Sequence, residues 1–145
     1  MNEVIQAECV GNMSFESEID GYQLHFDAEE QFGGTHRGYR PKPVVLAALA
    51  ACTGMDVVSI LGKKKVKFSI FKINVTGEVS EEYPKYYKKI HLLYEFTGPG
   101  FQDDEELRTK VNRAVRLSRD QYCAVSAMLK NSCEITDEII LKDSQ

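Results

Sequence analysis

The sequence predicts a mixed fold of strands and helices. Three observations carry this prediction. Apolar and polar residues alternate through residues 5–26, a long apolar segment of helical composition follows at residues 43–61, and both kinds of pattern recur after it. A chain of 145 residues can bury a hydrophobic core without disulfides or metals. We therefore expect one domain spanning residues 1–145.

The first third of the chain is expected to form strands. Alternation over residues 5–9, 13–15 and 22–26 predicts extended segments, and the turns between them are predicted at Gly11-Asn12 and Asp20-Gly21. Residues 27–43 then form the longest irregular stretch, which contains several glycines and prolines together with Arg37 and Arg40. Loops of this length in a small domain often have a functional role.

A helix is predicted over residues 43–61. Pro43 is tolerated in a first turn, and the alanines and leucines that follow are good helix formers. The segment is apolar around nearly its whole circumference, so sheets or a second subunit must cover most of it. Cys52 therefore lies away from bulk water, and Gly62 is expected to end the helix.

Hydrophobic periodicity and turn residues predict the remaining helices and strands. Residues 71–79 and 90–96 alternate as strands, with a turn at residues 81–84 between them. Acidic residues 103–106 suit a helix amino terminus, and one apolar face follows, made of Leu107, Val111, Ala114 and Val115. A short helix from about residue 120 to 130 and a strand at residues 135–141 complete the chain.

Composition excludes several classes of function. Apolar and charged fractions of 43% and 28% are ordinary for a soluble protein, and a net charge of −4 gives no reason to invoke nucleic acid. The amino terminus lacks the regions of a signal peptide. The apolar run at residues 43–52 is too short to cross a bilayer, and Asp56 interrupts its extension. We expect a cytoplasmic protein without nucleic-acid or membrane partners.

Four cysteines are present, but their spacing matches no zinc site. There is no Cys-x-x-Cys pair, and the three histidines are scattered, so no metal is expected. A cytoplasmic compartment favours free or catalytic thiols over disulfides. Cys9 and Cys133 are interpreted as inert, because unpaired cysteine usually packs as a small hydrophobe.

Cys52 and Cys123 are the candidate redox pair. Cys123 opens a helix, whose first amides can activate a thiolate. Cys52 is interior and needs a cation or hydrogen-bond donor, for which the preceding loop offers candidates: His36, Arg37, Arg40 and Lys42. Asp56, one helical turn after Cys52, needs a partner, such as an arginine from that loop or from a partner subunit. Two inert core cysteines fit the same pattern.

The residues around both cysteines resemble the OsmC/Ohr family, the osmotically inducible protein C and organic hydroperoxide resistance group, in its OsmC-like branch. The likeness rests on three segments: Arg40-Pro41, the helix ending Leu-Ala-Ala-Cys-Thr-Gly-Met-Asp-Val-Val-Ser-Ile-Leu, and Tyr-Cys-Ala-Val-Ser-Ala-Met-Leu around Cys123. The resemblance implies an α+β fold with antiparallel sheets around a long buried central helix. It also implies an intertwined homodimer with two active sites at the subunit interface.

In such a family member, Cys52 would be the peroxidatic thiol and Cys123 the resolving thiol. An external thiol would reduce the resulting disulfide, and no metal or organic cofactor is implied. The expected function is a thiol-dependent peroxidase that reduces organic hydroperoxides in oxidative-stress defence. The alternative is non-catalytic binding of a small apolar or thiol-bearing ligand at the dimer interface.

The chain departs from the family pattern where the thiol is activated. Characterised hydroperoxide reductases of the family carry a glutamate after the proline that precedes the buried helix, whereas Pro41 is followed here by Lys42. They also carry an arginine near the amino terminus, and none occurs in residues 1–36. Ala124 stands where the family often has proline. Arg37 or Arg40 as a substitute activator is a hypothesis.

Overall fold

The computed structural model describes residues 1–144, and the chain divides into two compact units, Met1–Val45 and Leu46–Gln145. The boundary falls within the helix α1 (Pro41–Lys63). Two three-stranded sheets and this long helix confirm the α+β class. The expectation of one domain over residues 1–145 stays a prediction.

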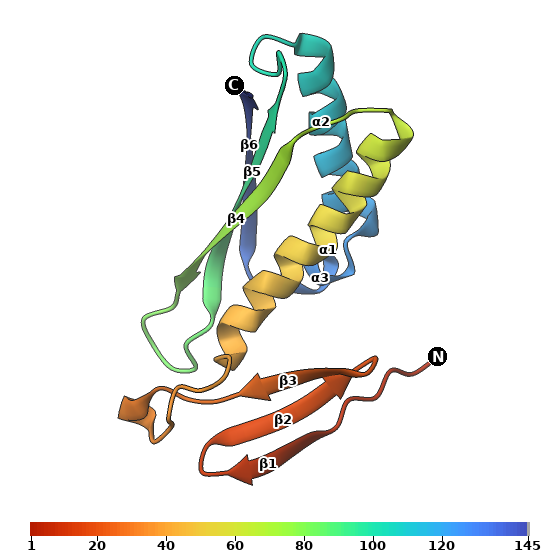
Figure 1. Cartoon of the computed structure of the whole chain (residues 1–145). Coiled ribbons are helices and arrows are strands. Elements are labelled where there is room, and N and C mark those ends of the chain that lie inside the picture. Colours follow the sequence, from red (N-terminus) through yellow and green to blue (C-terminus); the bar gives the residue numbers. More distant parts are fainter. Residues whose placement is uncertain (145) are drawn as a thin grey trace. The chain divides into compact units, whose positions relative to one another are not determined.

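The first unit contains an antiparallel meander of three strands in the order β1-β2-β3 (Figure 1). Its strands are β1 (Ala7–Gly11), β2 (Ser14–Ile19) and β3 (Tyr22–Phe26). Asn12 and Asp20 have φ angles of 50° and 52°, the left-handed conformation of tight turns, so both expected turns are present. After β3 comes a single 3₁₀ turn, η1 (Glu30–Phe32).

The second unit contains a sheet in the order β4-β5-β6. Strands β4 (Ile70–Val79) and β5 (Tyr87–Gly98) form an antiparallel hairpin. Strand β6 (Glu134–Asp143) pairs in parallel with β5, which departs from the purely antiparallel sheets expected. The reason is the helical crossover between them, made of α2 (Glu105–Leu117), the π-helical turn η2 (Ser118–Tyr122) and α3 (Ala124–Leu129).

Helices α1 and α2 lie on the same side of this sheet (Figure 1). The covered face of β5 presents every second residue to the core: Ile90, Leu92, Tyr94 and Phe96. The apolar face predicted for α2 is buried as expected. Asp104 caps α2 by accepting the amide N–H of Leu107 at 2.9 Å, as the acidic segment predicted.

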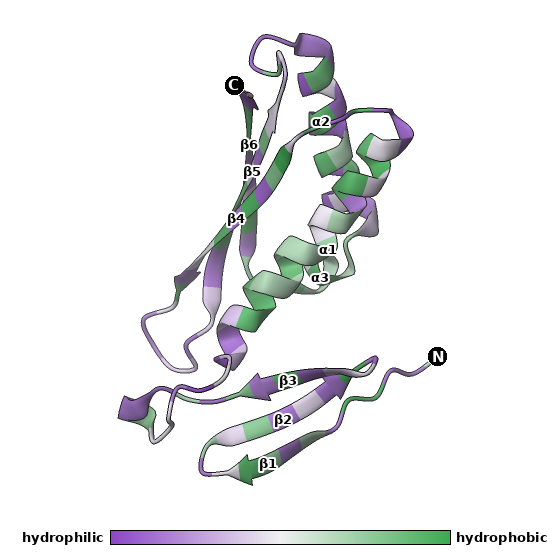
Figure 2. Cartoon of the chain, in the orientation of Figure 1, coloured by the Kyte–Doolittle hydropathy of each residue, from purple (hydrophilic) through white to green (hydrophobic). Residues whose placement is uncertain are grey.

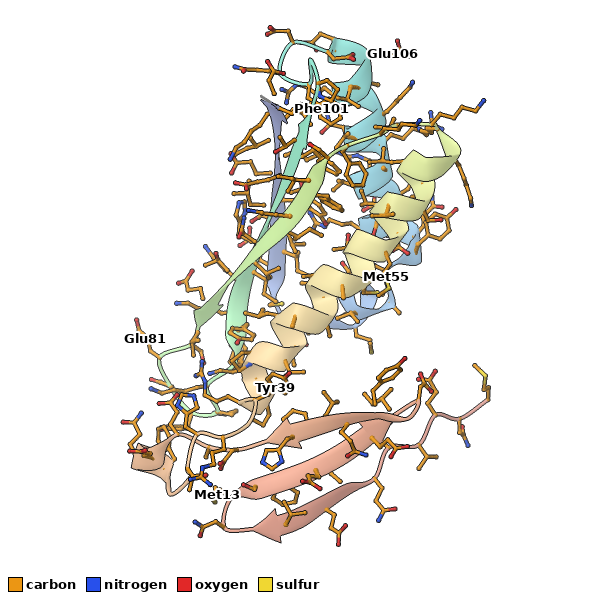
Figure 3. All side chains as sticks on the ribbon, viewed as in Figure 1. Met13, Tyr39, Met55, Glu81, Phe101 and Glu106 are labelled. Atoms are coloured by element: carbon orange, nitrogen blue, oxygen red, sulfur yellow. The ribbon has the colours of Figure 1, made fainter. Side chains whose placement is uncertain are left out.

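Helix α1 is buried by its own chain along one stripe only, formed by Leu49, Thr53, Val57 and Leu61. Hydrophobic colouring nevertheless extends along the helix in Figure 2, and Met55, labelled on α1 in Figure 3, is 71% exposed. The expectation that most of the helix is covered is therefore not met within a single chain.

Two details of α1 correct the sequence analysis. The helix spans 23 residues, so its length and composition alone would allow it to cross a membrane, and the apolar run is not too short. This is weak evidence, because core helices of soluble proteins pass the same test. Gly62 does not end the helix: Lys65 takes the left-handed conformation with a φ of 57°, and the amide of Val66 bonds back to Leu61 at 3.0 Å.

Candidate functional site

The two candidate thiols meet in the second unit. Cys52 lies half-buried on α1 and packs against the hydrophobic core, and Cys123 is 2% exposed at the entrance of α3. The Cys52 thiol lies near enough to the Cys123 thiol to contribute to the raised pKa of Cys123. The fold therefore brings together two sulfur atoms that the sequence separates widely.

Cys123 is the N-cap residue of α3. Its backbone is extended, with φ −75° and ψ 104°, and its sulfur accepts the amide N–H of Ser126 at 3.4 Å. Burial, and to a smaller extent the neighbouring Cys52 thiol, raise the pKa of the Cys123 thiol to about 11, although the hydrogen bond from the Ser126 amide opposes this. This amide in the first turn of the helix thus lowers the pKa of Cys123, as the sequence predicted, but burial outweighs it.

A chain of buried hydroxyl groups borders the thiol pair. The Thr53 hydroxyl lies 2.8 Å from the Tyr94 hydroxyl and 2.8 Å from that of Ser118. Ser118 in turn donates to Asp56 Oδ2 at 2.8 Å. Ser118, from η2, is thus the partner that Asp56 needs, where the sequence suggested an arginine.

Asp56, the acceptor at one end of this series of hydroxyl groups, sets the direction of each hydrogen bond between them. Each hydroxyl has one proton to donate, and Ser118 gives its proton to Asp56. Thr53 must then donate to Ser118, and Tyr94 must donate to Thr53. Thr53 follows Cys52 directly and Asp56 lies one helical turn after it on α1, so these hydrogen bonds tie the surroundings of Cys52 to η2 and β5.

A cation lies at the Tyr94 end of this chain. Burial raises the pKa of Tyr94 to about 12, and the nearby Arg119 acts against that shift. The Arg119 guanidinium pairs with Asp137 and donates to the backbone carbonyl of Ile135 at 2.7 Å. Its buried Nε atom has no hydrogen-bond partner among residues 1–144.

The candidate activators Arg37 and Arg40 belong to the first unit. Arg40 forms an ion pair with Glu29 at 3.1 Å, and the backbone amide of Arg37 donates to Asp27 at 3.2 Å. Activation of Cys52 by either arginine stays a prediction.

Asp27 organises the loop that carries these arginines. The side chain is almost fully buried, and it accepts the Thr35 hydroxyl at 2.7 Å together with the backbone amides of Ala28, Thr35 and Arg37. The hydroxyl of Thr35, with these amides, holds the pKa of the Asp27 carboxyl well below its usual range, although burial acts in the opposite direction. The Asp27 carboxylate thus fixes the conformation of this loop, which the sequence did not predict.

Each unit contains an apolar hollow of ligand size. The first unit contains a cavity of about 570 Å³ between strands β2 and β3, η1 and the start of α1, lined by Met13, Phe15, Phe26, Phe32 and Arg40, among others. The second contains an open groove of about 720 Å³ along α1, between its exposed face and β4. Within residues 1–144, no three His, Cys, Asp or Glu side chains are grouped so that they could hold a metal ion.

Sequence reasoning missed Thr53, Tyr94, Ser118 and Asp27. Thr53 directly follows Cys52, and a hydroxyl beside a buried thiol was the available signal. Tyr94 was expected only as a core residue of a strand. Nothing in the local sequence distinguishes Ser118, because its partners are set by tertiary packing.

The fold and the segment that contains both cysteines are similar to those of known proteins. The family model of the OsmC-like protein matches residues 34–138. The protein YhfA of Escherichia coli strain K12 is 36% identical over 96 residues, which is 66% of this chain and 68% of YhfA. The chain belongs to the OsmC family.

Solved structures agree with this assignment. A hypothetical protein from Aquifex aeolicus VF5 has a TM-score of 0.83 and 26% identity, with 100% of this chain and 99% of that chain covered. An organic hydroperoxide resistance protein OsmC from Legionella pneumophila has a TM-score of 0.66 and 16% identity, with 96% of each chain covered. At that identity the second likeness shows the fold alone.

Proposed function

We propose that this protein is a thiol-dependent peroxidase that reduces organic hydroperoxides through Cys52 and Cys123. Membership of the OsmC family supports a role in the response to peroxide stress, and the Legionella protein of the same fold is described as an organic hydroperoxide resistance protein. The observation that carries the proposal is the proximity of the two thiols, since the Cys52 thiol helps to raise the pKa of Cys123. Two thiols that lie close together need little movement to form a disulfide.

The chemistry proceeds in three balanced steps. The Cys52 thiolate attacks one oxygen of the hydroperoxide, the O–O bond breaks, and the alkoxide takes a proton to leave as an alcohol. Cys52 is then a sulfenic acid. Cys123 attacks this sulfur as its thiol proton passes to the departing hydroxide, so the S–O bond breaks and water leaves as the disulfide forms. An external thiol reductant supplies two electrons and two protons to restore both thiols.

Each residue has a distinct part in this scheme. Cys52 is the more accessible of the two sulfurs and reacts with the peroxide, whereas Cys123 is buried and is held as a neutral thiol by its raised pKa. Cys123 therefore does not compete for peroxide, because only a thiolate is strongly nucleophilic. Arg37 and Arg40 are the proposed cations that activate Cys52 in place of the missing glutamate and arginine.

The proposed assembly is a cytoplasmic homodimer. Only 22% of the apolar window of α1 is buried by its own chain, and the groove beside Met55 and Val58 presents apolar surface. A second copy packed on this surface would cover it, as is typical of the family. Sedimentation velocity should then report a dimer, and a monomer at micromolar concentration would contradict the assembly.

The function is tested by mixing the reduced protein with an alkyl hydroperoxide and counting free thiols. Two thiols should be lost per chain, and mass spectrometry should locate a disulfide between Cys52 and Cys123. Cys52→Ser should abolish the reaction, and Cys123→Ser should leave Cys52 as a sulfenic acid that a dione reagent traps. Cys9→Ser is the matched control, since Cys9 is exposed and has no role in the proposed reaction. Retention of all thiols in the wild-type protein would refute the peroxidase.

The cavity of the first unit favours a second candidate, the binding of a small apolar or thiol-bearing ligand without redox turnover. Its walls include three aromatic rings, and its volume of about 570 Å³ suits a small molecule. Native mass spectrometry of the freshly purified protein tests this candidate. A retained small molecule, together with thiols inert to hydroperoxide, would favour binding over catalysis.

A further inference from the structure

Ser118 joins the surroundings of both thiols. Its side chain donates to Asp56 and accepts from Thr53, each at 2.8 Å, and both partners lie on α1 beside Cys52. Its backbone carbonyl accepts the amide N–H of Cys123 at 2.7 Å. Ser118 therefore binds helix α1, which carries Cys52, through its side chain, and it binds Cys123 through its backbone carbonyl.

The position of Ser118 makes this link stiff. The residue is fully buried and begins the π-helical turn η2, which leads from α2 directly to Cys123. Both its side-chain bonds are internal to the protein, and the direction of each is set by Asp56 at the end of the hydroxyl chain. A buried network in which every hydroxyl is satisfied holds one arrangement and resists others.

We propose that Ser118 is a positioning residue that holds Cys123 against Cys52 for disulfide formation, an inference that rests on the proposed thiol chemistry. A disulfide forms only over a narrow range of Cα and Cβ separations, so a small displacement of η2 slows the attack of Cys123 on oxidised Cys52. The first step, attack of Cys52 on peroxide, requires no approach of Cys123. Ser118 therefore acts on the second step alone.

The test follows the two steps separately in the full-length protein. Oxidation of Cys52 is measured by trapping its sulfenic acid with a dione reagent, and disulfide formation is measured by mass spectrometry after rapid quenching. Ser118→Ala removes the hydroxyl, and Ser118→Thr restores one at the same position. Thr109→Val is the control, because it removes a hydroxyl from an exposed position of α2.

In Ser118→Ala, disulfide formation should slow by about tenfold or more while Cys52 oxidises at the wild-type rate. Ser118→Thr should recover most of the lost rate, which a general loss of packing would not allow. If Ser118→Ala does not fold, Thr53→Val breaks the same link from α1 and should show the same selective loss, with Thr53→Ser as its rescue. Wild-type rates of disulfide formation in the folded hydroxyl-free variants would overturn the proposal.

A second oxidant separates this inference from the proposed function. Diamide takes two electrons and two protons from a thiol pair and needs no peroxide reaction. If alkyl hydroperoxide leaves wild-type Cys52 unchanged, the peroxidase fails, yet diamide still reports how well Cys123 meets Cys52. Slower diamide-driven disulfide formation in Ser118→Ala than in Ser118→Thr supports the positioning role, and equal rates refute it.

Discussion

The hydroxyl groups beside the thiols predict unequal losses of stability for two substitutions that each remove one oxygen atom. Tyr94→Phe removes only the first donor of the chain, so Thr53 loses a proton that it accepts but keeps its own donation to Ser118. Thr53→Val has nearly the same shape as threonine, yet it removes the middle of the chain. The Tyr94 hydroxyl and the Ser118 oxygen then both lose a buried partner.

The magnitudes follow from the cost of unmade hydrogen bonds. Loss of one neutral hydrogen bond lowers the free energy of unfolding by about 1 kcal/mol, whereas each buried polar group without a partner costs about 1–3 kcal/mol. We therefore expect a loss of about 1 kcal/mol for Tyr94→Phe and about 3 kcal/mol for Thr53→Val. For a chain of this size, about 1 kcal/mol corresponds to about 3 °C in Tm.

Urea unfolding followed by circular dichroism measures both losses. All variants must be compared at one protein concentration, because a dimer gains stability by mass action. Thr109→Val serves as the exposed control and should change the free energy of unfolding by less than about 0.5 kcal/mol. Equal losses for Tyr94→Phe and Thr53→Val, or the larger loss for Tyr94→Phe, would refute the direction assigned to the chain.

Three further predictions concern pH and assembly. Because the pKa of Cys123 is raised from 9.0 to about 11, the folded protein keeps a proton that the unfolded chain loses, so stability should fall as pH rises between about 9 and 11; Cys123→Ala should weaken this slope in urea titrations. The lowered pKa of Asp27 has the opposite sign: stability should fall as pH drops below its ordinary value near 3.8, and Asp27→Asn should expose the loop at residues 28–40 to proteolysis at neutral pH. Met55→Glu places a charge on the exposed face of α1 and should shift sedimentation toward the monomer without unfolding the chain, so an unchanged dimer would place the interface elsewhere.

Local patterns predicted most of the elements. Alternation with period two located the strands, and the apolar face of α2 was correctly assigned because a half-buried helix leaves a strong periodic signal. The end of α1 was misplaced, since Gly62 stays helical and the left-handed position falls on Lys65. The direction of β6 could not be read from its residues, because a strand has the same alternation in a parallel as in an antiparallel pair.

The candidate site shows the same division. The residues that flank Cys52 and Cys123 indicated the family and the two candidate thiols, but they did not indicate the pKa of either thiol. A short helix at Cys123 suggested activation, whereas burial, which depends on the whole core, raises its pKa instead. Activation by Arg37 and Arg40 stays a prediction.

The sequence by itself determined the fold class, most of the helices and strands, and the two cysteines with the residues that flank them. The period of 3.6 residues in helices and of 2 in strands is set by local backbone geometry, so both periods can be recognised in the sequence. Only the tertiary structure decided that Cys52 meets Cys123 and that Asp56 takes its hydrogen bond from Ser118. Those pairings join segments far apart in the chain, and they exist because the packing of α1, η2 and β5 brings their side chains within bonding distance.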